Sequence, residues 1–292
     1  MGFRDGSTLT FQTIYQSPLL SVRDYRCCAL RGGPAGEEDS TSNNIVLMRH
    51  GVFCKHFNRR TVTADVNQAV FFTRGSTYRV SHPGDCGDRG TVFGVSPRLL
   101  CDIIRELDPA IDEHAERPFD FVTGPCDSGV FWRHRELVMR LEAADAHPLE
   151  PIWADVTTLQ LVAEVLEAAY TRRGRSRRRR RTGTDVDHAE RVEAVKSYLA
   201  ARLGERVALD EVARTVHASP FHLARVFQER TGVPIHRYLT RLRLRAALER
   251  LGGGARDLTE LALDLGFSSH SHFTDTFRRE FGRSPSAARL AK

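Results

Sequence analysis

Two clusters of side chains suited to recognising nucleic-acid bases lie about 50 residues apart in the last third of the chain, each at the start of a predicted helix. The first comprises Ser219, Pro220, Phe221, Ala224 and Arg225, and the second comprises Ser269, His270, Ser271, Thr274, Asp275, Arg278 and Arg279. An arginine fork matches the N7 and O6 acceptors of guanine, an apolar side chain can contact the thymine methyl group, and a carboxylate can accept from the cytosine amino group. These residue types therefore support noncovalent reading of DNA base edges.

The members of the two clusters are expected to take different roles. Arg225 is the candidate for reading a guanine, because its fork points away from the predicted core. Phe221 has two interpretations, contact with a thymine methyl group or packing in the core. Asp275 can accept from a cytosine, although an acidic group near phosphates weakens binding. We expect Arg278 and Arg279 to contact the phosphate backbone, which positions the protein without reading sequence.

Residues suited to catalysis or metal binding do not form a recognisable site. The chain has no G-x-S-x-G motif, no phosphate-binding loop and no His-x-His pair with a downstream Glu and His. His50, Cys54 and His56 are close along the chain and His82 lies in a predicted turn, but we interpret them as structural or surface residues. All six cysteines fall within residues 1–171 and none forms C-x-x-C, which indicates reduced, mostly buried thiols. We expect no catalytic residue, no metal and no cofactor.

Hydrophobic spacing places each cluster on the second helix of a helix-turn-helix pair. Leu223 and Phe227 would form the buried side of the first such helix, and Phe273, Phe277 and Phe281 that of the second. The two pairs repeat at an offset of 49 to 50 residues, and the one-residue difference falls in a turn. The sequence therefore predicts two similar recognition helices.

Capping residues mark the ends of these helices. Ser219 is a natural N-cap and Gly232 ends the first recognition helix. In the second pair, Asp257 and Glu260 have the spacing of a capping box, and Gly266 supplies the left-handed residue of the turn.

A predicted helix over Pro234–Leu251, ended by Gly252–Gly254, separates the two pairs. At 1.5 Å per residue it would be roughly 27 Å long. Successive major grooves of B-DNA lie ~34 Å apart, so the helix could hold two recognition helices in neighbouring grooves. Its arginines, Arg241, Arg243 and Arg245, are open to two interpretations: phosphate contacts, or solvated and intramolecular charges.

Residues 188–290 resemble the C-terminal DNA-binding region of the AraC/XylS family of bacterial transcription regulators. The resemblance rests on SPFHLARVF from Ser219, YLTRLRLRA from Tyr238, LALDLGFSSHSHF from Leu261 and FRREFGRSP from Phe277. It implies binding of double-stranded promoter DNA, transcription activation with RNA polymerase as a further partner, and an N-terminal cupin-like domain that responds to a small effector, dimerises, or both.

Four positions depart from the family pattern. His217 replaces a small turn residue, Ala208 stands where a capping Ser or Thr is common, and Ala288 stands where an aromatic residue often follows the final proline. Asp275 occupies a recognition-helix position that is often basic or polar. The departures leave the predicted fold intact but leave base specificity open.

The sequence pattern of residues 1–171 predicts an antiparallel β-barrel or sandwich followed by helices, which agrees with the cupin-like domain that the resemblance implies. Short β-prone clusters separated by turns cover Ile45–Met48, Val52–Phe53, Val70–Phe72 and Thr91–Val95. Helices are expected over 97–107, 129–146 and 151–170. The last carries an apolar stripe that fits core packing or a homodimer interface, formed by Ile152, Val156, Leu159, Val162, Leu166 and Ala169. Aromatic residues that could line an effector pocket, or equally fill the core, are Phe53, Phe71, Phe72 and Tyr78.

The formal charge is unevenly distributed. Residues 1–171 carry −6, the eight arginines of residues 172–181 give +8, and residues 186–292 carry +5. Repulsion within the arginine run predicts a solvated linker over residues 172–187, between an N-terminal domain and a DNA-binding domain over 188–292. The basic last domain indicates a polyanionic partner. No apolar run is long enough for a membrane span and no signal segment is present, so we expect a cytoplasmic protein without a membrane partner.

Three functions are compatible with these observations. The leading interpretation is an α+β multidomain protein that acts as a homodimeric, sequence-specific transcription regulator and, by resemblance, as an activator. The first alternative is a metal-dependent cupin enzyme carrying a DNA-targeting module. The second is a protein that binds nucleic acids without sequence preference through its arginine run. The sequence names neither the promoter nor an effector.

Overall fold

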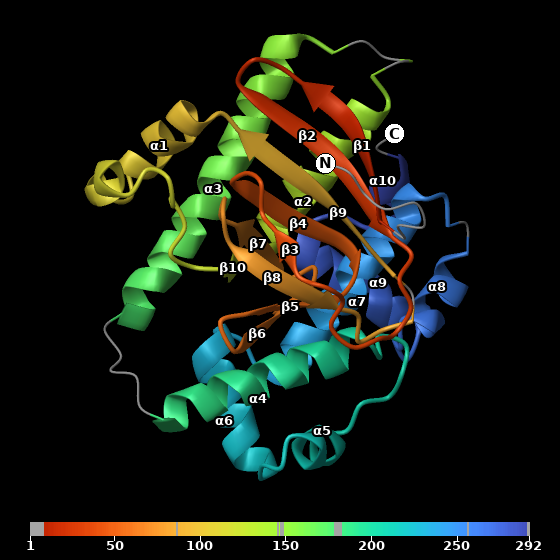
Figure 1. Ribbon diagram of the computed structural model, residues 1–292. Helices are drawn as coiled ribbons and strands as arrows, with labels where there is room; N and C mark the ends of the chain where they lie inside the picture. The colour runs from red at the N-terminus through yellow and green to blue at the C-terminus, as the bar shows by residue number, and fades with distance from the viewer. Residues whose placement is uncertain are drawn as a thin grey trace. The chain divides into compact units, whose positions relative to one another are not determined.

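The computed structural model describes residues 9–85, 87–144, 146, 149–177, 183–255 and 257–290. The chain divides into two compact units, Met1–Arg179 and Arg180–Lys292 (Figure 1). The first unit contains antiparallel sheets followed by helices, and the described part of the second is helical throughout. The predicted fold class, α+β with an all-α C-terminal domain, is confirmed. Among the described residues no helix combines the length and apolarity that a membrane span needs.

Two antiparallel sheets build the first unit. The larger has the strand order β1-β2-β9-β4-β7-β10 and the smaller has the order β3-β8-β5-β6. The strands are β1 (Leu9–Gln16), β2 (Leu20–Cys27), β3 (Glu38–Asp39), β4 (Asn44–Gly51), β5 (Phe53–Phe57), β6 (Arg60–Ala64), β7 (Gln68–Phe72), β8 (Thr77–Ser81), β9 (Asp88–Val95) and β10 (Thr123–Pro125). Three of the predicted β-prone clusters lie in β4, β7 and β9, which are adjacent. Because both faces of these central strands are covered, their sequences are continuously apolar and easily found.

Helices follow β9 in this unit, with β10 between η1 and α2. They are α1 (Pro97–Arg105), the 3₁₀ helix η1 (Pro109–Glu113), α2 (Ser128–Glu142) and α3 (Pro151–Arg177). The predicted stripe on α3 is buried only in its second half, at Val162, Leu166 and Ala169. Its first half faces solvent, with Ile152 71% and Val156 47% exposed. Core packing therefore accounts for the second half of the stripe, and for the first turns of α3 the homodimer interpretation stays a prediction.

The structure differs from the predicted linker over residues 172–187. Helix α3 continues to Arg177, and α4 begins at Gly183. Arg173 is 14% exposed, with its guanidinium 2.6 Å from Oδ2 of Asp108 and 2.8 Å from Oδ2 of Asp120. Two carboxylates distant in sequence thus neutralise the charge of Arg173, which the linker prediction placed in solvent. Residues 178–182 of the predicted linker lie outside the described residues.

The second unit consists of seven helices over its described residues. They are α4 (Gly183–Ala200), α5 (Leu209–Thr215), α6 (Pro220–Thr231), α7 (Ile235–Gly252), α8 (Leu258–Asp264), α9 (His270–Phe281) and α10 (Pro285–Leu290). The predicted pairs are α5 with α6 and α8 with α9, and the predicted long helix is α7. Phe227, Phe273 and Phe277 are fully buried, so aromatic packing forms the core that holds both pairs.

Candidate nucleic-acid interface and effector cavity

Helix α6 presents the first cluster as predicted from its spacing. The Ser219 hydroxyl accepts a hydrogen bond from the backbone N–H of His222 at 3.3 Å, and Gly232 ends the helix with φ +82°. Leu223 and Phe227 are buried, which turns the opposite side of the helix outward. Ser219, Phe221 and Arg225 are exposed, while Pro220 and Ala224 are half-buried. Phe221 is 82% exposed, so its interpretation as a core residue is wrong.

The Arg225 guanidinium lies on the exposed side of α6. Its side chain is 52% exposed, and Nη1 is 2.9 Å from Oε1 of Glu229, one turn further along the helix. An exposed pair of this kind contributes roughly 0.3–0.5 kcal/mol. The pairing is weak enough for a guanine or a phosphate to replace it.

Helix α9 presents the second cluster in the same way. The Ser269 hydroxyl accepts from the backbone N–H of His272 at 3.1 Å, and Phe273 and Phe277 are buried. The outward residues are Ser269, His270, Ser271, Asp275, Arg278 and Arg279, with Thr274 half-buried. The exposed face therefore combines two arginines, one acid and small hydrogen-bonding groups, which suits contacts to both phosphates and base edges.

The two turns share one hydrogen-bond pattern. The backbone N–H of Ala218 donates to the Ala213 carbonyl, and that of Phe267 donates to the Ala262 carbonyl, each at 3.0 Å. The residue before each donor has a positive φ, +50° at His217 and +73° at Gly266. A Cβ at Gly266 would also lie 2.7 Å from the Arg243 guanidinium. Glycine is therefore required in the second turn, whereas the first turn holds a histidine in a strained conformation.

Replacing His217 by glycine is expected to stabilise the second unit by about 1 kcal/mol, because glycine adopts the left-handed conformation without the Cβ penalty. Urea unfolding followed by far-ultraviolet circular dichroism measures the change. His217→Ala is the matched control, since it removes the imidazole and keeps the strain. An alanine variant as stable as the glycine variant would show that the imidazole, not the backbone, is unfavourable.

The arginines of α7 make contacts within the unit. Arg243 donates to the carbonyls of Leu203 at 2.8 Å, Glu205 at 2.7 Å and Gly266 at 3.0 Å. Arg241 pairs with a Glu280 oxygen at 2.9 Å, and Arg245 is fully buried. Arg243 and Arg241 thus connect α7 to the segment after α4, to the turn of the second pair and to α9, and Arg245 is shielded from solvent, so all three fit the intramolecular interpretation.

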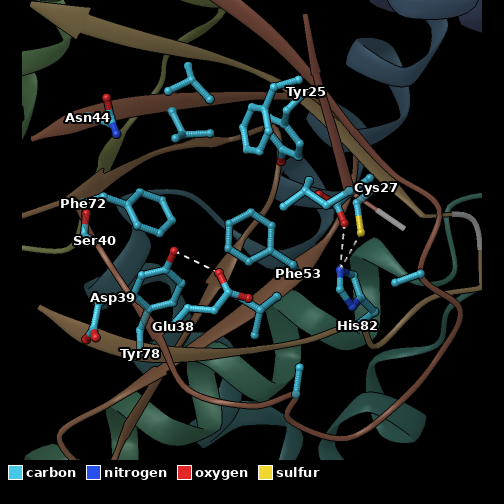
Figure 2. Close-up of a pocket in the computed structure, with 18 of the residues that line it drawn as sticks. Tyr25, Cys27, Glu38, Asp39, Ser40, Asn44, Phe53, Phe72, Tyr78 and His82 are labelled. Carbon is cyan, nitrogen blue, oxygen red and sulfur yellow. Dashed lines mark hydrogen bonds and ion pairs between the residues drawn. The ribbon is translucent and has the colours of Figure 1, made fainter. Parts of the chain in front are cut away.

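A cavity of about 520 Å³ lies in the first unit, lined by both sheets (Figure 2). Of the predicted effector residues, Phe53, Phe72 and Tyr78 line it. Phe71 does not, because it packs against Phe119 and Phe121, with ring centroids 5.0 and 4.8 Å away. Further lining residues, which sequence reasoning missed, are Phe11, Arg23, Tyr25, Val46, Val80 and Val92. The sequence signal that could have identified these residues is the alternation of side chains between the two faces of a strand.

Lys55 lies behind the aromatic wall of the cavity. Its Nζ is 3.8 Å from the ring centroid of Phe72 and 4.9 Å from that of Tyr78, and it donates to the Phe71 carbonyl at 3.1 Å. Burial lowers the pKa of Lys55 from its ordinary 10.5 to about 8. The cation–π contacts and the single carbonyl acceptor thus only partly replace the hydration that the Lys55 ammonium loses on burial.

The lowered pKa of Lys55 predicts that alkaline pH stabilises the first unit. Between pH 8 and 10.5 the unfolded chain keeps the proton and the folded chain releases it, so the free energy of unfolding rises with pH. Lys55→Met lacks this titration. Its free energy of unfolding should exceed that of the parent at about pH 7, and the difference should shrink by about pH 9.5. Fluorescence of Trp132 and Trp153, both in this unit, measures unfolding. A constant difference between the two proteins would contradict the prediction.

The histidines and cysteines singled out in the sequence do not assemble as one group. His56 bonds Thr61 and Ser81 hydroxyls at 3.0 and 2.7 Å, and Cys54 is buried beside Thr63. His82 instead lies near two residues that sequence reasoning did not connect with it, Cys27 and Asp88. Cys86 lies outside the described residues.

Comparison with known proteins agrees with the geometry of the second unit. Residues 212–291 match the family model of a helix-turn-helix domain. The HTH-type transcriptional activator RhaS of Escherichia coli is 37% identical over 97 residues, which are 33% of this chain and 35% of the relative. RhaS of a second E. coli strain is 36% identical over the same length. The matched region thus spans about a third of these relatives.

Two solved structures are also similar. A regulator with an AraC-type DNA-binding domain from Chromobacterium violaceum is 29% identical over 34% of this chain and 88% of its own, with a TM-score of 0.33. ToxT from Vibrio cholerae is 12% identical over 96% of this chain and 97% of its own, with a TM-score of 0.36.

Paired helix-turn-helix motifs that match this family model define a DNA-binding domain. The C-terminal part of the chain is a helix-turn-helix DNA-binding domain of the AraC type, as the resemblance in its sequence implied.

Proposed function

We propose that this protein is a sequence-specific transcription regulator, acting as an activator, whose first unit controls the DNA-binding unit. The observation that carries the proposal is the pair of helices α6 and α9, which share a serine N-cap and equivalent buried positions and turn polar and charged residues outward. The names of the matched relatives support activation, and the matched family favours a regulator over an enzyme. On this proposal double-stranded promoter DNA and RNA polymerase are the macromolecular partners.

Selection of bound sequences from a random DNA library tests the proposal. We expect one preferred site with two recognised segments about one helical turn apart, because α7 separates two similar recognition helices. Competition with random DNA then measures specificity, expected to be about 10³-fold or more. Enrichment of no sequence would support nonspecific nucleic-acid binding and contradict the proposal.

The arginine run is proposed to add phosphate contacts without reading sequence. Replacing Arg178, Arg179, Arg180 and Arg181, which lie outside the described residues, by glutamine should flatten the dependence of affinity on salt. The expected change in the slope of log K against log salt is about 0.9 per lost contact. Titrations at several salt concentrations measure it. Loss of sequence preference at an unchanged slope would contradict this role.

The cavity supports binding of a small, largely apolar effector by the first unit. Aromatic and aliphatic side chains line most of it, and Arg23, Glu38 and Asn44 add groups that can orient a polar end. A ligand of this class should raise the midpoint of thermal unfolding followed by tryptophan fluorescence.

The start of α3 supports homodimerisation. Ile152 and Val156 lie one turn apart and are both exposed, which leaves an apolar face that a second copy could cover. Sedimentation of the full chain at micromolar concentration tests this, and a monomer would contradict it.

A further inference from the structure

Three potential metal ligands of different chemistry meet at one side of the cavity. Cys27 ends β2 and lies opposite Asp88, its register partner on β9. His82 follows β8, and its backbone is held by paired hydrogen bonds with Gly32, at 3.1 and 3.3 Å. Two adjacent strands and a backbone bridge thus fix the three side chains, and Figure 2 shows Cys27 beside His82.

The donor atoms are spaced as ligands of one small cation. Nε2 of His82 is 3.4 Å from Sγ of Cys27 and 3.0 Å from Oδ2 of Asp88, and all three atoms lie within 4.8 Å of one another. Sulfur, nitrogen and oxygen ligands of tetrahedral zinc are about 3.2 to 3.7 Å apart. The two distances from His82 therefore match this spacing to within a few tenths of an ångström, and the thiol and the carboxylate oxygen lie within 4.8 Å of each other.

The carboxylate gives an independent indication of a cation. Asp88 is 4% exposed, and its Oδ2 has no donor at hydrogen-bond geometry among the described residues, although His82 is 3.0 Å away. A buried carboxylate oxygen without a donor is unfavourable unless a positive charge compensates it. Thiolate, imidazole and carboxylate together are ligands typical of Zn²⁺.

We propose that Cys27, His82 and Asp88 bind a zinc ion that has one coordination position open to the cavity. All three residues line the cavity, so the fourth position faces its interior. Structural zinc sites use four protein ligands, whereas three leave room for water or an exogenous donor. An effector with an anionic oxygen, nitrogen or sulfur donor would complete the site, a step that rests on the proposed role of the cavity.

Cobalt(II) added to the reduced, metal-free full-length protein tests the site. We expect one equivalent to bind, with the visible absorption of tetrahedral cobalt and a near-ultraviolet thiolate-to-cobalt charge-transfer band, and zinc to displace it. Cys27→Ser should abolish the charge-transfer band. His82→Gln and Asp88→Asn should each weaken binding by about tenfold or more while keeping the thiolate band at saturation.

Cys28→Ser is the matched control, because Cys28 is the adjacent, exposed thiol and lies outside the cluster. It should keep both the affinity and the spectrum. Tryptophan fluorescence establishes that each variant is folded. If Cys27→Ser unfolds, the cobalt affinity of His82→Gln tests the site instead. The proposal is overturned if the parent binds no cobalt, if the thiolate band survives in Cys27→Ser, or if His82→Gln binds as tightly as the parent. None of these measurements involves DNA, so they separate the metal site from the proposed regulator function.

Discussion

Arg225→Ala is expected to weaken binding to the preferred DNA site by about 1–3 kcal/mol, roughly a 5- to 150-fold loss. Arg225 lies on the exposed side of α6, and its ion pair with Glu229, one turn further along the helix, is a weak surface pair. A guanidinium that binds guanine in two places loses both hydrogen bonds on truncation, whereas a phosphate contact would be lost equally on every sequence. Fluorescence anisotropy with the preferred and a random duplex, at one salt concentration, measures both affinities.

Two control variants isolate the role of Arg225. Arg214→Ala removes the same charge from the last turn of α5, outside the clusters, and should weaken binding to both duplexes only slightly. Glu229→Gln releases Arg225 from its intrahelical partner and should preserve sequence preference. An equal loss for Arg225→Ala on both duplexes would identify Arg225 as a phosphate contact and contradict base reading.

Arg49→Met is expected to destabilise the first unit by about 3 kcal/mol. Arg49 is fully buried and contacts the carboxylates of Asp24 and Glu142. Methionine fills most of the volume of Arg49 but removes its ion pair with Asp24. The Asp24 side chain is 3% exposed, so water cannot replace the lost positive charge. Urea unfolding followed by tryptophan fluorescence measures the effect, because both tryptophans belong to this unit.

Arg89 offers a matched control for Arg49. It contacts the same two carboxylates, Asp24 at 2.9 Å and Glu142 at 3.0 Å, but is 25% exposed. Water can replace part of its interaction, so Arg89→Met should cost about 1 kcal/mol. Equal losses for the two variants would show that burial does not determine the strength of these pairs.

The DNA-binding unit could be predicted from sequence because its determinants are local. Buried residues recur three or four positions apart on each helix, and Ser219, Asp257 and Ser269 satisfy backbone N–H groups two or three residues ahead. Such interactions span less than a helical turn, so they are visible in the order of residues. The caps, the turns and the outward faces of α6 and α9 follow from them.

In the first unit the central strands and the helices α1, α2 and α3 were predictable, but the edge strands were not. β4, β7 and β9 are covered on both faces and read as apolar runs, whereas β1 is largely exposed and has no such signal. Arg173, assigned to a solvated linker, is instead neutralised by Asp108 and Asp120, more than fifty residues earlier. Charge repulsion along the chain could not anticipate that pairing.

The sequence by itself determined the two recognition helices, their caps and the long helix between them, because each depends on neighbours within one or two turns. Only the tertiary structure decided between the two interpretations of Phe221, placed Phe71 outside the cavity, and showed that Cys27, His82 and Asp88 converge. The last two outcomes depend on strand register and sheet packing, which bring together residues up to 61 positions apart whose spacing along the chain carries no periodic signal.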